Sequence, residues 1–97
     1  MIVHLVLFKF KAGVAADDAR MSALAKAMDE LPHQIPLIRS WHHGPNRTND
    51  PLAWDYGLQA VFNSRADLEA YFEDPAHLPV VDQWAAIAEL RFVDFET

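Results

Sequence analysis

Two side chains in the stretch AYFEDPAHLPVV, residues 70–81, are of types that could move protons together. Tyr71 and His77 are six residues apart, and Pro75 stands between them. A neutral imidazole can take a proton from a carbon beside a carbonyl group, while a phenol hydroxyl donates a hydrogen bond to the oxygen on which negative charge develops. If the pair is catalytic, we expect His77 as base and Tyr71 as oxyanion donor, with no metal and no organic cofactor.

A structural role explains His77 as well as a chemical one does. At the start of a helix the positive end of the dipole favours a neutral imidazole, since the ordinary histidine pKa is about 6.5. The same ring, placed just after Pro75, could instead hydrogen-bond backbone groups and fix the corner between two helices. Both interpretations stay open at this level.

Three other histidines are candidates with simpler explanations. His4 lies in an apolar strand, where a buried imidazole is usually satisfied by a neighbouring group, although a direct catalytic role is a second hypothesis. His42 and His43 are adjacent in an expected strand, so their side chains point to opposite faces and cannot close on one ion. With no cysteine in the chain, we expect no metal site.

The elements that must position these residues follow from periodicity, capping signals and prolines. Mixed apolar and β-branched runs predict strands, and amphipathic runs bounded by caps and prolines predict helices. We expect strands over 2–10, 37–43, 54–62 and 90–96, and helices over 17–31, 64–72 and from shortly after Pro75 to about Ala88. The order β-α-β-β-α-β with one extra short helix predicts an α+β, ferredoxin-like fold.

The segment around Asp74 and Pro75 predicts how the tyrosine and histidine meet. Ser64 and Asp67 form a capping-box pattern that opens one helix. This helix must end before Pro75, because the residue preceding a proline is pushed out of helical geometry. The reversal can then turn Tyr71, at the end of one helix, and His77, at the start of the next, toward one cavity.

A four-stranded sheet with helices on one side leaves its other face open. Apolar residues occupy both alternating sets of the first strand, with Val3, Leu5 and Leu7 on the set opposite Val6 and Phe8. If that face were in contact with water, a large apolar patch would be exposed. We therefore predict a homodimer formed through the open sheet face.

Composition limits the remaining choices. The chain has 97 residues, 52% of them hydrophobic, which fits one domain over 1–97. The formal net charge of -6 and scattered Lys and Arg disfavour nucleic acid and anionic membranes as partners. No apolar run approaches the roughly 20 residues of a membrane span, and the first residues make a poor export signal. We expect a cytoplasmic protein.

Several segments together resemble one known family. They are HLVLFKFK at the start, GPN at residues 44–46, DYGLQAVF at 55–62, LEAYFEDPAHLPVV at 68–81 and VDFE at 93–96. They resemble the stress-responsive A/B-barrel (Dabb) domain family, over nearly the whole chain. The resemblance implies a ferredoxin-like protomer and a dimeric α+β barrel.

The resemblance also implies candidate site residues. Some family members are polyketide cyclases that close a ring by an aldol-type reaction without a cofactor, in a pocket between helices and sheet. Their tyrosine and histidine correspond to Tyr71 and His77, and a strand-one histidine corresponds to His4. Tyr56 stands where these cyclases have a further histidine. Small or polar residues replace aromatic ones on the first helix, at Ser22, Ala23 and Lys26.

The functional hypotheses therefore belong to different classes, because a fold does not fix a function. The first is a small apolar pocket that binds a carbonyl-bearing or aromatic ligand. Its expected edge residues are His4, Tyr56, Tyr71 and His77. The second is a cofactor-independent cyclase, lyase or isomerase. The third is a structural dimer with a filled core, and a heme- or quinone-handling monooxygenase is more distant.

Overall fold

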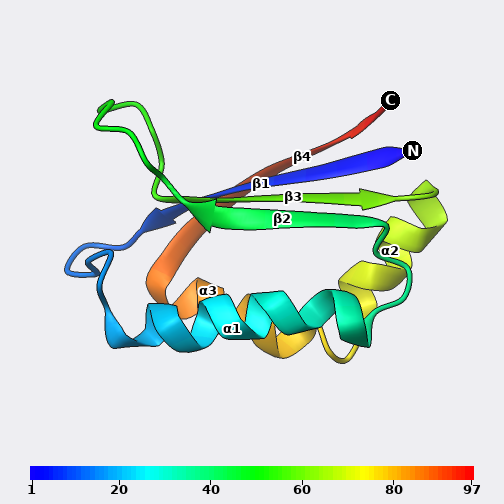
Figure 1. Ribbon diagram of the computed structural model, residues 1–97, viewed down its shortest axis with the longest axis horizontal. Coiled ribbons are helices and arrows are strands. Elements are labelled where there is room, and N and C mark those ends of the chain that lie inside the picture. The colour runs from blue at the N-terminus through cyan, green and yellow to red at the C-terminus, as the bar shows by residue number, and fades with distance from the viewer.

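Four strands form one antiparallel sheet, and three helices lie on one side of it (Figure 1). The computed structural model describes all residues, 1–97. The elements are β1 (Ile2–Phe10), α1 (Ala19–Gln34), β2 (Ser40–Pro45), β3 (Tyr56–Phe62), α2 (Arg65–Glu73), α3 (Leu78–Ile87) and β4 (Ala88–Glu96). The strand order is β2-β3-β1-β4. This arrangement confirms the predicted ferredoxin-like α+β fold.

Helix α1 passes through a proline that was expected to end it. Pro32 has no N–H to donate to the carbonyl of Met28, one helical turn earlier. The indole Nε1 of Trp41 donates to that carbonyl instead, at 3.0 Å. The prediction that the helix stops at Leu31 was wrong, because a strand residue satisfies the carbonyl and the helix continues to Gln34.

Strand boundaries also differ from the predicted ones. β2 begins at Ser40, because Leu37 and Ile38 instead pack against the core in the turn after α1. It continues through Gly44 to Pro45, opposite Tyr56 on β3. A proline is tolerated there because β2 is an edge strand with a free side.

The inner face of the sheet carries the core. Alternate residues of the strands point at the helices, as the two-residue period of a strand requires. Phe62 on β3 and Ile87 at the end of α3 are completely buried. The core is a cluster of 17 buried residues drawn from sheet and helices.

The outer face of the sheet points away from every helix (Figure 1), and it is largely apolar where β1 pairs with β4. Leu5 on β1 pairs with Val93 on β4, and Val3 pairs with Phe95. Leu5, Val93 and Phe95 are exposed, as is Leu7. These four side chains, with the buried Val3, make up the outer apolar face.

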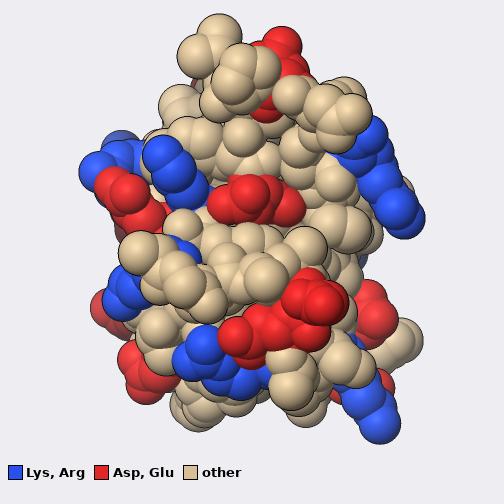
Figure 2. Space-filling model, turned by 90° about the vertical axis from the view of Figure 1, so that its left-hand side faces the viewer, with Lys and Arg blue, Asp and Glu red and all other residues tan.

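Charged side chains of both signs are mixed over the surface. On the end of the molecule seen in Figure 2, Lys and Arg alternate with Asp and Glu around uncharged residues and make no continuous basic patch. No helix combines the length and the apolar content that crossing a bilayer requires.

Candidate functional site

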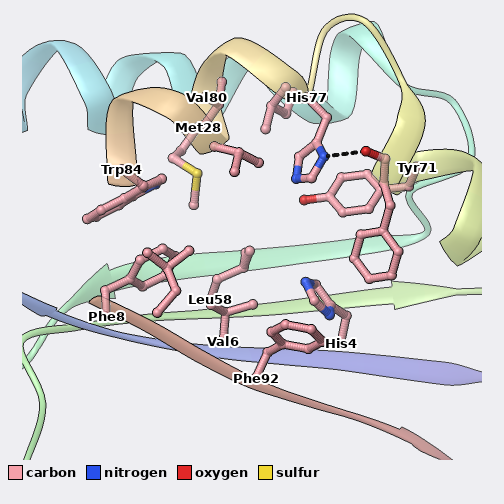
Figure 3. Close-up of a pocket in the computed structure, with 14 residues that line it drawn as sticks. His4, Val6, Phe8, Met28, Leu58, Tyr71, His77, Val80, Trp84 and Phe92 are labelled. Carbon is pink, nitrogen blue, oxygen red and sulfur yellow. Dashed lines mark hydrogen bonds between the residues drawn. The ribbon is translucent and has the colours of Figure 1, made fainter. Parts of the chain in front are cut away.

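A cavity of about 240 Å³ lies between the helices and the inner face of the sheet (Figure 3). Twelve of its fourteen lining residues are hydrophobic, and the other two are His4 and His77. The lining residues are His4, Val6, Phe8, Met28, Leu31, Leu58, Tyr71, Phe72, His77, Val80, Val81, Trp84, Leu90 and Phe92. An apolar cavity with few polar groups is typical of a small-molecule site.

Tyr71 brings the only hydroxyl group among the lining residues. It is buried near the end of α2, and its ring packs against Phe62 with centroids 4.9 Å apart. The hydroxyl makes no hydrogen bond within the chain, and the neighbouring imidazoles of His4 and His77 are engaged through Nδ1 with Asp94 and Phe72. Figure 3 shows it turned into the cavity. Burial raises the pKa of Tyr71 well above its ordinary value of 10.0, so the phenol keeps its proton.

His77 stands on the helix side of the cavity, directly before α3. Its Nδ1 lies 3.3 Å from the carbonyl oxygen of Phe72. Because a carbonyl only accepts hydrogen bonds, Nδ1 carries the hydrogen in the neutral ring and Nε2 is free to accept a proton. The rings of Tyr71 and His77 contact each other, with centroids 4.1 Å apart.

Burial is the main reason why the pKa of His77 is lowered from 6.5. The nearby His4 lowers it further, while the Phe72 carbonyl and Asp74 act in the opposite direction. A neutral imidazole was expected from the helix dipole; desolvation gives the same result by a different cause. The bond to Phe72 supplies the backbone contact that the corner-fixing role requires, and it leaves Nε2 without a partner in the chain.

The turn at Asp74 and Pro75 brings these residues together, as predicted. The amide of Asp74 donates to the carbonyl of Tyr71, and the amide of His77 donates to the carbonyl of Asp74 at 2.9 Å. The Asp74 carboxylate also accepts from the amide of Ala76. This tight reversal ends α2 and starts α3 with both rings facing the sheet.

His4 rises from β1 on the opposite wall of the cavity. It is 4% exposed, and its Nδ1 lies 2.5 Å from the Asp94 Oδ1 on β4, its cross-strand neighbour. Its ring contacts Phe72 at 5.2 Å and Tyr71 at 6.0 Å between centroids. The expectation that a neighbouring group satisfies this buried ring is confirmed, and the neighbour is an acid that sequence reasoning missed.

Tyr56 does not edge this cavity, so this part of the expected pocket was wrong. Its ring packs against Phe8 and Trp84, which line the cavity and separate it from Tyr56. The hydroxyl of Tyr56 is 2.6 Å from Nδ1 of His43, and Nε2 of His43 is 2.6 Å from Asp29 on α1. Tyr56 therefore ties the sheet to α1 rather than facing a ligand.

His42 and His43 lie on opposite faces of β2, as the strand period predicts. His42 pairs with Gln59 and is exposed, whereas His43 pairs with Leu58 and is partly buried. No group of three or more His, Asp or Glu side chains is arranged to hold a metal ion.

Sequence reasoning missed most of the apolar lining. Met28 and Leu31 line the cavity from α1. The three positions of α1 where the cyclases have aromatic residues are all exposed, namely Ser22, Ala23 and Lys26. Trp84 forms one wall, and its buried Nε1 has no hydrogen-bond partner. Phe92 stands at the open side by β4 and is 62% exposed.

Comparison with known proteins places the whole chain in one family. The model of the "Stress responsive A/B Barrel Domain" family matches residues 2–97. An uncharacterized protein of Streptomyces coelicolor, SCO4036, is 35% identical over 96 residues, which cover 99% of both chains.

Solved structures show the same fold. A dimeric protein of unknown function with a ferredoxin-like fold, from Bacteroides fragilis, is 27% identical with a TM-score of 0.87, over 99% of this chain and 95% of its own. The hydroxynitrile lyase of Passiflora edulis is 15% identical with a TM-score of 0.82, over 97% and 90% of the two chains. At that identity the likeness shows the fold alone.

Proposed function

Because the chain belongs to the stress-responsive A/B-barrel domain family, we propose that it binds a small apolar compound carrying a carbonyl group in the cavity of Tyr71 and His77. The observation that carries this proposal is the Tyr71 hydroxyl, which is 1% exposed as a residue, unpartnered and turned into an apolar cavity. In walls that are otherwise almost wholly apolar, this hydroxyl can donate a hydrogen bond to a ligand carbonyl oxygen, which is worth about 0.5–1.5 kcal/mol.

The size and lining of the cavity support this ligand class. About 240 Å³ holds a small molecule, and the walls of Phe8, Met28, Leu58 and Trp84 match alkyl or aryl carbon. No cationic side chain lines the cavity, so a compound with several negative charges is a poor fit.

A cofactor-independent lyase, isomerase or cyclase is a second candidate, with His77 as base and Tyr71 as oxyanion donor. The specific observation in its favour is the contact of the two rings at 4.1 Å, with Nδ1 of His77 already engaged by Phe72. This leaves Nε2 to take a proton from the carbon beside the carbonyl that Tyr71 binds. Every group that this step needs is supplied by the chain.

A second copy of the chain is the proposed partner, seated on the outer apolar face. Leu5, Leu7, Val93 and Phe95 are exposed side by side on two paired strands. Association would remove this apolar surface from water, which is worth about 25 cal/mol for each Å². The structurally similar protein of Bacteroides fragilis is named as dimeric.

The ligand proposal is tested by a ligand-observed NMR screen of small β-keto acids, phenolics and quinones. Wild type, His77→Ala and the exposed-histidine control His33→Ala are compared at equal folded concentration. We expect hits with wild type and His33→Ala that His77→Ala binds weakly or not at all. Equal binding by all three would place any ligand outside this cavity, and no binding by wild type would reject these classes.

A further inference from the structure

The loop between β2 and β3, residues 46–54, forms an arm on the outer side of the sheet. Figure 1 shows it in green, rising from the sheet on the side away from the helices. At the base of the arm the amide of Asp55 donates to the carbonyl of Phe8 at 2.8 Å, and the Asp55 carboxylate accepts from the amide of Phe10 at 2.7 Å. The arm is therefore fixed to β1, a strand that carries part of the outer apolar face.

Hydrogen bonds within the arm brace it further. The side chain of Asn46 donates to the carbonyl of Thr48 at 2.8 Å and accepts from its amide at 3.3 Å. The Asp50 carboxylate accepts from the amide of Leu52 at 2.8 Å. Asn and Asp side chains that bond the backbone two residues further on are typical of tight turns. A loop held in this way loses little conformational freedom when a partner covers it.

Leu52 is the most exposed of the large hydrophobic residues, at 88%. A single exposed leucine is ordinary, but this one belongs to an arm that adjoins the outer apolar face. The Lys9 Nζ lies 6.0 Å from the centroid of the Trp54 ring, close to the base of the arm. Lys9 follows Leu5 and Leu7 on the outward side of β1. The arm and the outer apolar face therefore form one continuous surface.

Beside Leu7 the outer face of the sheet has no side chains. Leu7 pairs with Gly57 on β3, and Gly57 pairs with Gly44 on β2. Paired residues of neighbouring strands point to the same face, so the two glycines lie on the outer face with Leu7. A Cβ on Gly44 would meet no heavy atom within 4 Å, and one on Gly57 would meet only the Val6 carbonyl oxygen, at 3.9 Å. Gly44 and Gly57 form a glycine recess, where another chain can approach the backbone closely.

A stable dimer needs more surface than the outer apolar face offers. Specific interfaces bury roughly 800 Å² on each partner and involve about 20–30 residues a side. The outer apolar face has four exposed side chains and the buried Val3. The arm and the glycine recess extend this surface toward one end of the sheet, on the side that a second copy would cover.

We propose that the arm is part of the contact between two copies and that Leu52 of each copy lies in the glycine recess of the other, an inference that rests on the proposed association through the outer apolar face. In a two-fold symmetric pair, what one copy presents the other must accept. The branched side chain of Leu52 and the bare backbone bordered by Leu7 are complementary in shape. Because each chain carries both, one dimer contains two such contacts.

A disulfide between copies tests this contact directly, because the chain has no cysteine of its own. In the double variant Leu52→Cys with Gly57→Cys, mild oxidation should give a covalent dimer on non-reducing electrophoresis, since the Cα atoms of a disulfide lie within about 7 Å. The controls are the two single variants and Leu78→Cys with Gly57→Cys, whose leucine is exposed at the start of α3. If the double variant forms no more covalent dimer than the controls, the proposal is overturned.

A second test fills the recess and shortens the side chain that would occupy it. Gly57→Leu adds a side chain for which a single copy has room, and Leu52→Ala removes most of the leucine. Each should raise the dimer dissociation constant by about 10-fold or more in analytical ultracentrifugation, whereas Leu78→Ala should not change it. The double variant Leu52→Ala with Gly57→Leu should associate more tightly than Gly57→Leu alone, because the added side chain then has space. Simple multiplication of the two losses would contradict the contact.

The same measurements separate failure of this inference from failure of the proposed association. If wild type dimerises and the substitutions at Leu52 and Gly57 leave the dissociation constant unchanged, the arm is not part of the contact although the association stands. If wild type remains monomeric at every concentration measured, the proposed association fails and the role of the arm fails with it.

Discussion

The two faces of the sheet carry similar apolar residues, which are buried on one face and exposed on the other. On the inner face, Phe8 and Phe62 are buried under helices, and the cavity lies between Phe8 and the helices. On the outer face, Leu5 and Leu7 of the same strand β1 are exposed. One strand therefore lines the cavity on one side and forms part of the outer apolar face on the other.

The two faces also differ in the groups that stand at their centres. The inner face holds the two anchored imidazoles and one free hydroxyl, whereas the central outer positions Leu5 and Val93 are apolar and opposite each other. Chemistry and assembly would then use separate residues. Substitutions on one face should leave the function of the other largely unchanged, as long as the fold persists.

The largest expected effect is on the stability of the inner face. Phe62→Ala removes a completely buried ring from the core beside Tyr71 and should lower the free energy of unfolding by about 3–5 kcal/mol. Lys26→Ala, at an exposed position of α1, should change it by less than about 0.5 kcal/mol. Urea unfolding of the two variants measures the difference. A small loss for Phe62→Ala would contradict the packing described for the inner face.

The next effect is on self-association through the outer face. Leu7→Asp with Val93→Asp places two charges on the outer apolar face and should raise the dimer dissociation constant by about 100-fold or more. Leu78→Asp supplies a matched exposed leucine outside that face, at the start of α3. Analytical ultracentrifugation measures the constants. If both variants associate as wild type does, the contact between copies lies elsewhere.

A smaller effect is expected from the single hydroxyl in the cavity. Tyr71→Phe keeps the ring and removes the donor, so affinity for a carbonyl ligand should fall by up to about 10-fold, the worth of a typical hydrogen bond. Tyr56→Phe removes a hydroxyl that contacts His43 and should leave ligand affinity unchanged. Isothermal titration calorimetry with any hit from the screen compares the pair. A greater loss of affinity in Tyr56→Phe would reverse the assignment of the two tyrosines.

The smallest effect is a change of stability with pH that comes from His77. Its pKa in the folded chain lies below the ordinary value of 6.5, so between these two values the unfolded chain binds more protons. Its contribution to stability is present above about pH 6.5 and is lost as the pH falls through the folded pKa. The loss of stability between pH 7.5 and 5 should be smaller in His77→Gln than in wild type, whereas the exposed-residue variant His42→Gln should behave as wild type. Urea unfolding at both pH values checks this.

Local signals in the sequence were enough for most of the fold. Successive side chains of Ile2–Phe10 point to opposite faces of the strand. The reversal at Asp74 and Pro75 is predicted by residue types that cap or end helices. These signals depend only on residues close in sequence, and the structure has the strand and the reversal that they predict. For the same reason the meeting of Tyr71 and His77, which are close in sequence, could be predicted.

Contacts between distant residues could not be predicted in this way. His4 and Asp94 are 90 positions apart and meet only through the register of β1 with β4. Likewise, Trp41 allows α1 to continue past Pro32 because β2 passes beside that turn. An acid at an inward-facing position of β4 is the one signal that could have drawn attention to Asp94.

The central claim is that Tyr71 donates a hydrogen bond to a ligand carbonyl inside the cavity, and carbonyl ¹³C NMR tests it most directly. Benzylacetone labelled with ¹³C at the carbonyl would be titrated with wild type and with Tyr71→Phe. The account predicts that the bound carbonyl signal moves downfield in wild type, as hydrogen bonding polarises the C=O bond, and that most of this shift is lost in Tyr71→Phe. A bound signal with the same shift in both proteins would contradict it.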